Sequence, residues 1–460
     1  MPSPDKVLAA VDSNLQPALD RLFALLRIPS ISTDPAYAKH CAEAAEWHAK
    51  DLKSLGFKAE VRKTAGHPVV LGHRPKKGAP HVLFYGHYDV QPVDPLNLWH
   101  NPPFEPKVVE IEKGRKAIVA RGACDDKGQV MTFIEACRAW ITATGDLPIG
   151  VTVLLEGEEE CGSPSLPAFV KANAKELKAD FGLVCDTGMW DAKTPAVTST
   201  LRGMVYEEFV VRAANRDLHS GVYGGAALNP NHVVAEICGS FHGKNGRIRI
   251  PGFYKGVKAP SEKQLQQWKS LKLTEKAFLG PVGLKSTIGE DDRMLIEHIQ
   301  SRPTCDVNGI WGGYAGAGSK TVIPAEAGAK VSFRLVAGQD PDAIRKAFRA
   351  YVKDRVPKQA SVEFRSYVGS SAVAFDTTSA PFDAARAALR EEWGKAAVTI
   401  GLGGSIPIMH EFRHVLGLDC VLVGFALEDD RVHSPNEKYD LAAFHKGMRS
   451  WARIIGKLGG

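Results

Sequence analysis

A run of carboxylates between Glu156 and Glu160 follows a short apolar stretch, and this combination is the strongest chemical signal in the sequence. The residues before it, 151–155, are aliphatic or β-branched, and a Cys-Gly-Ser segment ending at Ser163 closes the run. Such a stretch predicts a buried β-strand that carries acids at its carboxyl end. Carboxylates packed this closely repel one another and need a shared proton or a metal ion. Of the two, the sequence favours a metal ion.

Other histidine and acidic side chains occur at similar positions, each just after an apolar stretch. Because apolar strands alternate with helical segments, the sequence predicts an α/β fold with a mostly parallel sheet sandwiched by helices. Sheets of this kind place functional groups at the carboxyl ends of their strands. The side chains in question follow the predicted strands 81–85, 117–120, 181–185 and 420–425: His87 and Asp89, Asp125, Asp186, and His433.

The candidate ligands are imidazole and carboxylate groups, with no closely spaced pair of cysteines among them. This mixture suits catalytic zinc and related divalent metals better than a closed structural zinc site. Five ligands are too many for one tetrahedral catalytic zinc that keeps a position for water, so the set suits two metals that share a bridging carboxylate. The five are His87, Asp125, Glu160, Asp186 and His433.

Two further acids next to these ligands have other expected roles. Asp89 lies two residues after His87 and can accept the hydrogen of the second ring nitrogen, which fixes the tautomer that binds metal. Glu159 adjoins a ligand, has no metal of its own to bind, and could deprotonate a metal-bridging water. The residues therefore predict a hydrolase that uses an activated water.

The length of the chain and a change of pattern in its middle predict two domains. A chain of 460 residues exceeds one ordinary hydrophobic core. A helix is expected from about residue 8 to 27 at the start, whereas strands with half-exposed alternation are expected at 204–211 and 329–335. We expect an inserted α+β domain, residues 200–375, between two parts of a catalytic metal-binding domain, residues 1–199 and 376–460.

Composition and charge bear on location and partners. The hydrophobic content of 44% and charged content of 24% are typical of soluble globular proteins. A net charge of +6 is small, and the basic residues are scattered, which does not indicate nucleic-acid binding. No apolar run could span a bilayer, no export signal is visible, and the 8 cysteines lack any CxxC pair. We expect a cytoplasmic protein with no nucleic-acid or membrane partner.

Four motifs, taken with their order and spacing, carry a resemblance to a known family. They are Gly86-His87-Tyr88-Asp89-Val90-Gln91-Pro92, the segment 122–128, the segment 156–163, and Asp186. In this order they resemble motifs of the dinuclear zinc metallopeptidases, which include carnosinase, bacterial dipeptidases, aminoacylase and succinyl-diaminopimelate desuccinylase. The resemblance runs from about residue 20 to the end and is strongest to the carnosinase-type branch, the cytosolic non-specific dipeptidases. It implies two Zn²⁺ per subunit, with Mn²⁺ or Co²⁺ as possible substitutes.

The resemblance also implies a role for each residue of the metal site. Asp125 would bridge the two zinc ions, Glu159 would be the general base, and Asp89 would orient a histidine ligand. A cis peptide is expected between Asp125 and Asp126. The remaining four ligands would divide into one pair for each ion: His87 with Asp186, and Glu160 with His433.

Four other segments resemble parts of the substrate site in the carnosinase-type branch. The histidine of the loop 217–225 would reach into the site of a partner subunit and polarise the scissile carbonyl, so the resemblance implies a homodimer formed through the inserted lid domain. The segments 320–325 and 333–336 would bind substrate, and the fork-shaped guanidinium of an arginine there suits a free carboxylate. The loop 401–407 would close around the substrate. Five residues are thus assigned to substrate contacts: His219, Thr321, Arg334, Gly404 and Ser405.

Some positions depart from the family pattern and leave the substrate open. Cys161 stands where a serine is common, and Cys124 where serine, threonine or alanine is frequent. The segment 408–411 differs from carnosinases, and His410 within it could enter the substrate pocket or be an ordinary loop residue. These changes affect no predicted metal ligand.

Three functions remain compatible with the sequence. The first is metal-dependent hydrolysis of the amide bond of dipeptides or short peptides that carry a free C-terminal carboxylate. The alternative is a deacylase or amidohydrolase that acts on N-acyl amino acids or another non-peptide amide with the same two metals. The third is a non-catalytic binding or scaffold protein, which the retention of Glu159 beside a complete ligand set argues against.

Overall fold

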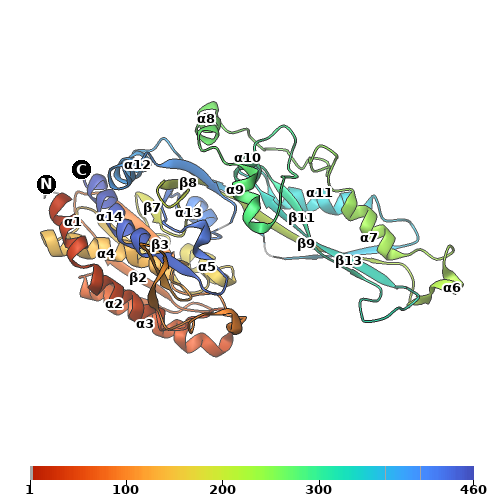
Figure 1. Ribbon diagram of the computed structural model, residues 1–460, viewed down its shortest axis with the longest axis horizontal. Coiled ribbons are helices and arrows are strands. Elements are labelled where there is room, and N and C mark those ends of the chain that lie inside the picture. The colour runs from red at the N-terminus through yellow and green to blue at the C-terminus, as the bar shows by residue number, and fades with distance from the viewer. Residues whose placement is uncertain (1–3, 368, 405) are drawn as a thin grey trace. The chain divides into compact units, whose positions relative to one another are not determined.

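The computed structural model describes residues 4–367, 369–404 and 406–460. Within it the chain divides into two compact units, which Figure 1 shows as ribbons. The first unit comprises Met1–Ser199, Phe375–Ile400 and Ile406–Gly460, and the second comprises Thr200–Ala374 and Gly401–Ser405. The expected domains 1–199, 200–375 and 376–460 stay a prediction, and the short segment 401–404 groups with the middle part of the chain.

A nine-stranded sheet, most of whose strands belong to the first unit, forms the centre of that unit. Its four middle strands are parallel neighbours, and the strands on either side of them pair antiparallel. The predicted α/β class is therefore confirmed, with the parallel part confined to the middle of the sheet. The strands in sheet order are β1 (Lys58–Arg62), β2 (Val69–Arg74), β6 (Gly150–Glu156), β3 (His81–His87), β7 (Phe181–Val184), β17 (Cys420–Leu422), β8 (Ala196–Leu201) and β15 (Val373–Ala374), and β16 (Val398–Leu402) also pairs with β8.

Helices pack against this sheet through large apolar side chains. Phe84 of β3 stacks on Phe133 of α4 with ring centroids 3.8 Å apart, and Trp451 of α14 meets Phe133 edge-on at 5.4 Å. Such aromatic contacts add to the burial of apolar surface. The helices of this unit are α1 (Pro4–Ser13), α2 (Leu15–Leu26), α3 (Ala38–Ser54), α4 (Lys127–Thr144), α5 (Leu166–Ala172), α12 (Ala380–Trp393), α13 (Met409–His414) and α14 (Leu441–Leu458).

The single helix expected over residues 8–27 is wrong, because the segment forms two helices. The chain breaks between α1 and α2 at Asn14, three residues before Pro17. Proline has no backbone N–H, so Pro17 cannot donate to the carbonyl of Ser13, and its ring crowds that carbonyl. The apolar spacing continues across the break, which is why the sequence pattern did not reveal it.

A three-stranded antiparallel sheet links two loops that carry predicted ligands. It consists of β4 (Lys107–Glu112), β5 (Arg115–Val119) and β18 (Lys438–Asp440), in the order β18-β5-β4. Tyr439 of β18 pairs with Ile118 of β5. Because β5 precedes Asp125 and β18 follows His433, this pairing holds the two loops side by side.

The second unit contains a four-stranded antiparallel sheet with the order β11-β13-β9-β14. Strands with half-exposed alternation were expected here at 204–211 and 329–335, and they form the middle of this sheet as β9 and β13. Phe333 and Phe348 meet in its hydrophobic core at 5.1 Å. The elements are β9 (Gly203–Arg212), β11 (Thr304–Gly312), β13 (Glu326–Leu335), β14 (Ser361–Ser366), the pair β10 (Leu218–His219) and β12 (Val322–Ile323), and the helices α6 (Ser220–Tyr223), α7 (Pro230–Gly239), α8 (Glu262–Ser270), α9 (Glu275–Leu279), α10 (Leu295–Gln300) and α11 (Pro341–Lys353).

No helix within 4–367, 369–404 or 406–460 combines the length and apolar character that crossing a membrane requires.

Candidate metal centre

The ends of the parallel strands bring several predicted ligands to one edge of the large sheet. β6 is buried along its whole length, as its run of aliphatic residues requires, and His87 at the end of β3 pairs with Glu156 at the end of β6. Asp186 follows the next strand, β7. Asp125 comes from the loop before α4, so four separate segments meet at this edge together with the loop of His433.

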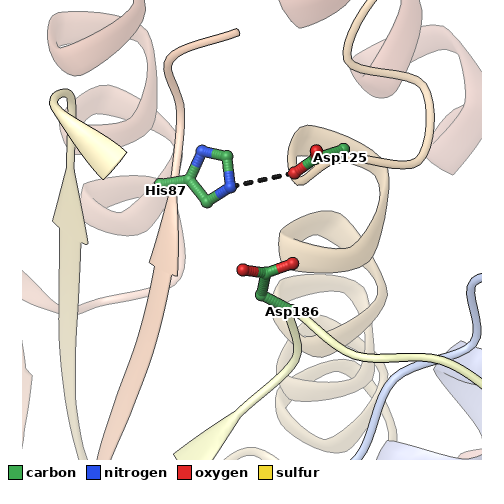
Figure 2. A group of neighbouring side chains, drawn as sticks. All are labelled: His87, Asp125 and Asp186. Carbon is green, nitrogen blue, oxygen red and sulfur yellow. Dashed lines mark hydrogen bonds and ion pairs between the residues drawn. The ribbon is translucent and has the colours of Figure 1, made fainter. Parts of the chain in front are cut away.

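Two groups of side chains in this region have the composition and spacing of metal ligands. In each group the potential ligand atoms lie within 4.8 Å of one another, and Asp125 belongs to both. Figure 2 shows the side chains of the first group converging on a common point. A carboxylate shared by two ligand groups is what two neighbouring cations require. The groups are His87 with Asp125 and Asp186, and Asp125 with Glu160 and His433.

The contacts inside these groups define which atoms face the common space. His87 Nε2 lies 3.1 Å from Asp125 Oδ1, as the dashed line in Figure 2 marks. His433 Nε2 lies 2.9 Å from Asp125 Oδ2 and 3.2 Å from Glu160 Oε2. The two oxygens of Asp125 therefore face two different histidines.

Burial makes three of the carboxyl groups in this region costly to ionise, those of Asp186, Glu160 and Glu159. Burial raises the pKa of Asp186 to about 7, with a further contribution from the charge of Asp125. Burial likewise raises the pKa of Glu160 and raises that of Glu159 well above its ordinary value. The hydrogen bond with Asp125, followed by that with Glu160, raises the pKa of His433 to about 10. Positive charge placed among these acids would stabilise their ionised forms, so the donor set fits divalent cations.

Asp89 contacts both a histidine ligand and the acidic turn after β6. His87 Nδ1 lies 3.1 Å from the carbonyl oxygen of Asp89 and 3.4 Å from its Oδ1. The Asp89 carboxylate also accepts hydrogen bonds from the backbone N–H groups of Glu159, at 3.3 Å, and Glu160, at 3.1 Å. The expected orientation of His87 thus involves the backbone of Asp89 as well as its side chain, and the same carboxylate holds the turn that carries Glu159.

Sequence reasoning missed Gln91, which lies within the first motif. Its side-chain amide donates to Glu160 Oε2 at 2.8 Å, so it orients a predicted ligand. Its position two residues after Asp89 was the available signal, but a lone glutamine in a loop usually faces solvent. The peptide bond between Asp125 and Asp126 is cis, as expected.

The cysteines near the site make contacts other than ligation. Cys124 donates to Asp430 Oδ2 at 3.4 Å, and Cys185 donates to Asp126 Oδ2 at 3.3 Å. Cys161 is exposed, and its thiol donates to the carbonyl oxygen of Glu158 at 3.3 Å. None of them belongs to a ligand group among the described residues.

A third acidic group, Asp429 with Asp430 and Asp440, also has ligand-like spacing. Lys438 Nζ lies 3.1 Å from Asp429, 2.5 Å from Asp430 and 3.7 Å from Asp440. Arg115 adds an ion pair of 2.6 Å to Asp440. These acids are already balanced by cationic side chains, so the group does not resemble the first two.

The predicted substrate-binding residues that the structure describes belong to the second unit. The exposed His219 ends β10, which pairs with β12, and the N–H of Ser220 donates to the carbonyl of Thr321 at 3.1 Å. Arg334 is half-buried on β13, and Gly404 is exposed. Ser405 lies outside the described residues. His410 lies on α13 of the first unit, with its ring 4.1 Å from that of His414, and joins neither ligand group.

Comparison with known proteins decides the family. The sequence model described as Peptidase family M20/M25/M40 matches residues 83–457. The chain belongs to this peptidase family. The predicted membership in the metallopeptidase family is therefore confirmed.

Three similar proteins indicate the branch of the M20/M25/M40 family. The Cys-Gly metallodipeptidase dug1 of Schizosaccharomyces pombe is 31% identical over 99% of this chain and 98% of the relative. The crystal structure of human carnosine dipeptidase 1 has a TM-score of 0.83 and 25% identity, and covers 100% of this chain and 99% of that one. An M20 family metallo-carboxypeptidase from Sulfolobus solfataricus has a TM-score of 0.83 and 29% identity, with 96% and 99% covered. The predicted similarity to the carnosinase-type branch is confirmed.

Proposed function

We propose that this peptidase hydrolyses the amide bond of dipeptides or short peptides with a free C-terminal carboxylate, using two divalent cations, zinc by preference. The observation that carries the proposal is the position of Asp125 in both ligand groups. The printed names of the similar proteins, a metallodipeptidase, a carnosine dipeptidase and a metallo-carboxypeptidase, favour this substrate class. Mn²⁺ or Co²⁺ would be expected to substitute, since the same oxygen and imidazole donors accept them.

The five predicted ligands would hold the two cations, with Asp125 between them. When bound, the cations supply Lewis acidity, which polarises the scissile carbonyl and acidifies a water. His87 would enter this arrangement already oriented, because its Nδ1 faces Asp89 and its Nε2 points toward Asp125, the proposed shared ligand.

Glu159 is the proposed general base. Its carboxylate would take a proton from the attacking water and later give it to the leaving amine. Burial raises the pKa of Glu159, which makes its carboxylate a stronger proton acceptor. The hydrogen bond from its backbone N–H to Asp89 fixes the start of the short turn η3 (Glu159–Cys161), so the base is held beside the ligands.

The second unit would supply the substrate contacts and the dimer interface. Arg334 would bind the substrate carboxylate, Thr321, Gly404 and Ser405 would contact the peptide, and His219 would polarise the scissile carbonyl from a partner subunit. A dimer through this unit is supported by the edge strand β11, where the apolar side chains of Ile310 and Trp311 are 58% and 36% exposed.

The proposed location is the cytoplasm. All eight cysteines have free thiols, which suits a reducing compartment.

A substrate panel with metal analysis tests the proposal. Purified protein loaded with Zn²⁺, Mn²⁺ or Co²⁺ would be assayed on dipeptides, on the same dipeptides with amidated C-termini, and on N-acetyl amino acids. We expect two metal ions per chain and turnover of the free dipeptides, with Asp125→Ala as the inactive control. Faster turnover of N-acetyl amino acids would replace the proposal with the deacylase alternative, and no turnover of any amide would reject an enzymatic role.

A further inference from the structure

Glu437 is a fully buried acid that contacts the loop of the proposed bridging ligand. Its Oε1 accepts hydrogen bonds from the backbone N–H groups of Cys124 and Asp125, each at 3.0 Å. Its Oε2 accepts from the backbone N–H of Gly122 at 3.0 Å and from Arg121 Nη1 at 2.8 Å. Both oxygens therefore have two donors, and three of the four donors are backbone groups of one loop.

Arg121 balances the charge of Glu437 and anchors it to a second part of the chain. Its side chain is 1% exposed, and its Nη2 donates to the carbonyl oxygen of Pro92 at 2.9 Å. A buried carboxylate without such a partner would be strongly destabilising. Because the ion pair is complete without Asp125, the side chain of Asp125 remains available to other partners.

Glu437 also lies only four residues after His433, the predicted ligand whose Nε2 is 2.9 Å from Asp125 Oδ2. The segment 431–437 is tightly turned: Arg431, His433 and Asn436 have φ values of 56°, 63° and 62°. Such left-handed conformations are uncommon for Arg and His, although Asn adopts them more readily, and they persist where surrounding contacts hold them. The backbone N–H of His100 donates to Asn436 Oδ1 at 2.7 Å and holds Asn436 in place. Glu437 is held by its hydrogen bonds with the loop 121–125. One short segment thus supports His433 and fixes the backbone of Asp125.

We propose that Glu437 is a positioning residue for the metal centre: its carboxylate sets the place of the Asp125 side chain relative to His433. This inference rests on the proposed function, since it takes Asp125 and His433 as metal ligands. The functional consequence would be a loss of metal affinity and turnover when the carboxylate is altered, although Glu437 itself contacts no predicted ligand side chain. Partners that hold metal ligands in this indirect way typically change affinity or activity 10- to 100-fold when they are mutated.

The competing explanation is that Glu437 forms only a structural ion pair. Glu392 on α12 provides a matched control within the same unit. Its side chain is 5% exposed and accepts hydrogen bonds from Arg449 Nε at 2.7 Å and Arg453 Nε at 2.9 Å. Among the described residues its hydrogen bonds and ion pairs are with Arg449 and Arg453, neither of which belongs to a loop that carries a predicted ligand. Glu392→Gln therefore removes a buried ion-paired carboxylate away from the predicted ligands.

The experiment compares Glu437→Gln, Glu392→Gln and the wild-type protein. The readouts are apparent Zn²⁺ affinity by competition with a chromophoric chelator, the visible spectrum of the Co²⁺-loaded protein, kcat and KM for a dipeptide, and the Tm of the metal-free protein. We expect Glu437→Gln to lose about 10- to 100-fold in metal affinity and kcat, with an altered Co²⁺ spectrum and a KM within about twofold of wild type. Glu392→Gln should show a similar change in Tm with wild-type affinity, spectrum and kcat. Wild-type affinity and spectrum in Glu437→Gln would overturn the proposal, as would equal losses in both variants.

If Glu437→Gln does not fold, Arg121→Lys replaces it in the same assays. Lysine keeps the charge but offers one nitrogen in place of the two that contact Glu437 and Pro92. A smaller loss of affinity and kcat in the same direction is therefore expected, and unchanged values would overturn the inference. Wild-type protein that binds no pair of metals would reject the proposed function itself. If the wild-type protein binds two metal ions and hydrolyses the dipeptide, and the variant does so equally well, only the role of Glu437 is rejected.

Discussion

His48 should make the first unit sensitive to acid, and its replacement by leucine should remove that sensitivity. The imidazole lies on α3, is fully buried, and packs beside Trp47 and Tyr88 with ring centroids 5.3 and 6.2 Å away. Within the described chain neither ring nitrogen has a hydrogen-bond partner. Burial, with a smaller contribution from the positive charge of Lys127, lowers the pKa of His48 from 6.5 to about 3.

The direction of the pH effect follows from these two pKa values. Below pH 6.5 the unfolded chain binds a proton at His48, whereas the folded protein does not bind one until about pH 3. The free energy of unfolding is therefore not reduced by His48 above pH 6.5. It decreases as the pH falls from 6.5 toward 3, because the unfolded chain is stabilised by the proton that His48 binds. The free energy of unfolding changes by up to about 1.4 kcal/mol per pH unit for one proton, so between pH 6.5 and 4.5 this residue should cost roughly 2 kcal/mol.

Urea denaturation of the metal-free protein between pH 4.5 and 7.5, followed by circular dichroism, measures this effect. Relative to wild type, His48→Leu should gain roughly 2 kcal/mol of unfolding free energy as the pH falls over this range. A difference in unfolding free energy that is the same at every pH would reflect packing alone and would not support a titration of His48. The control is Leu52→Ala on the same helix, which removes a buried apolar side chain and no titratable group, so its effect on stability should be the same at every pH. Parallel stability curves for wild type and His48→Leu would refute the reasoning.

Three further predictions concern the proposed activity. Glu159→Gln should keep both metal ions, measured by mass spectrometry, but lose about 10²- to 10⁴-fold in kcat; wild-type kcat would exclude Glu159 as the base. Removal of metal by a chelator should lower the Tm, and Zn²⁺ at 1,000 times its Kd should restore about 4 kcal/mol of stability in calorimetry. An unchanged Tm would contradict the proposal that bound cations stabilise this cluster of carboxylates. Arg334→Ala should raise KM roughly 10- to 100-fold for dipeptides with a free C-terminal carboxylate and leave amidated dipeptides unaffected; an equal effect on both would exclude carboxylate binding.

The main features of the fold were predictable because their signals are local. An apolar run that ends in a glycine and an acid, as in 151–160, identifies both a buried strand and the side chains at its end. The parallel pairing of β3, β6 and β7 then brings His87 and Asp186 to one edge without further information. Between residues 204 and 335 the pattern changes to strands in which apolar and polar residues alternate. This local change indicated an α+β architecture for the second unit.

Features that depend on long-range contacts were not predictable in this way. The ion pair between Arg121 and Glu437 joins residues that are 316 positions apart. In the sequence Glu437 is one more acid in a polar loop, which usually faces solvent. The break at Asn14 was hidden because apolar spacing continues through it. The grouping of 401–404 with the second unit likewise has no signal in the local sequence pattern.

The carboxylates after β6 illustrate why counting acids would overestimate the ligands. Glu156 accepts hydrogen bonds from the hydroxyls of Tyr85, at 2.5 Å, and Ser163, at 2.9 Å. Glu158 accepts from the backbone N–H groups of His67, at 3.0 Å, and Ser165, at 3.1 Å. These two acids therefore stabilise the turn, and only Glu159 and Glu160 remain for the proposed chemistry. Because Asp89 in turn accepts from the backbone N–H groups of both, the backbone that carries the proposed base and its neighbouring ligand is held by an acid from the loop after β3.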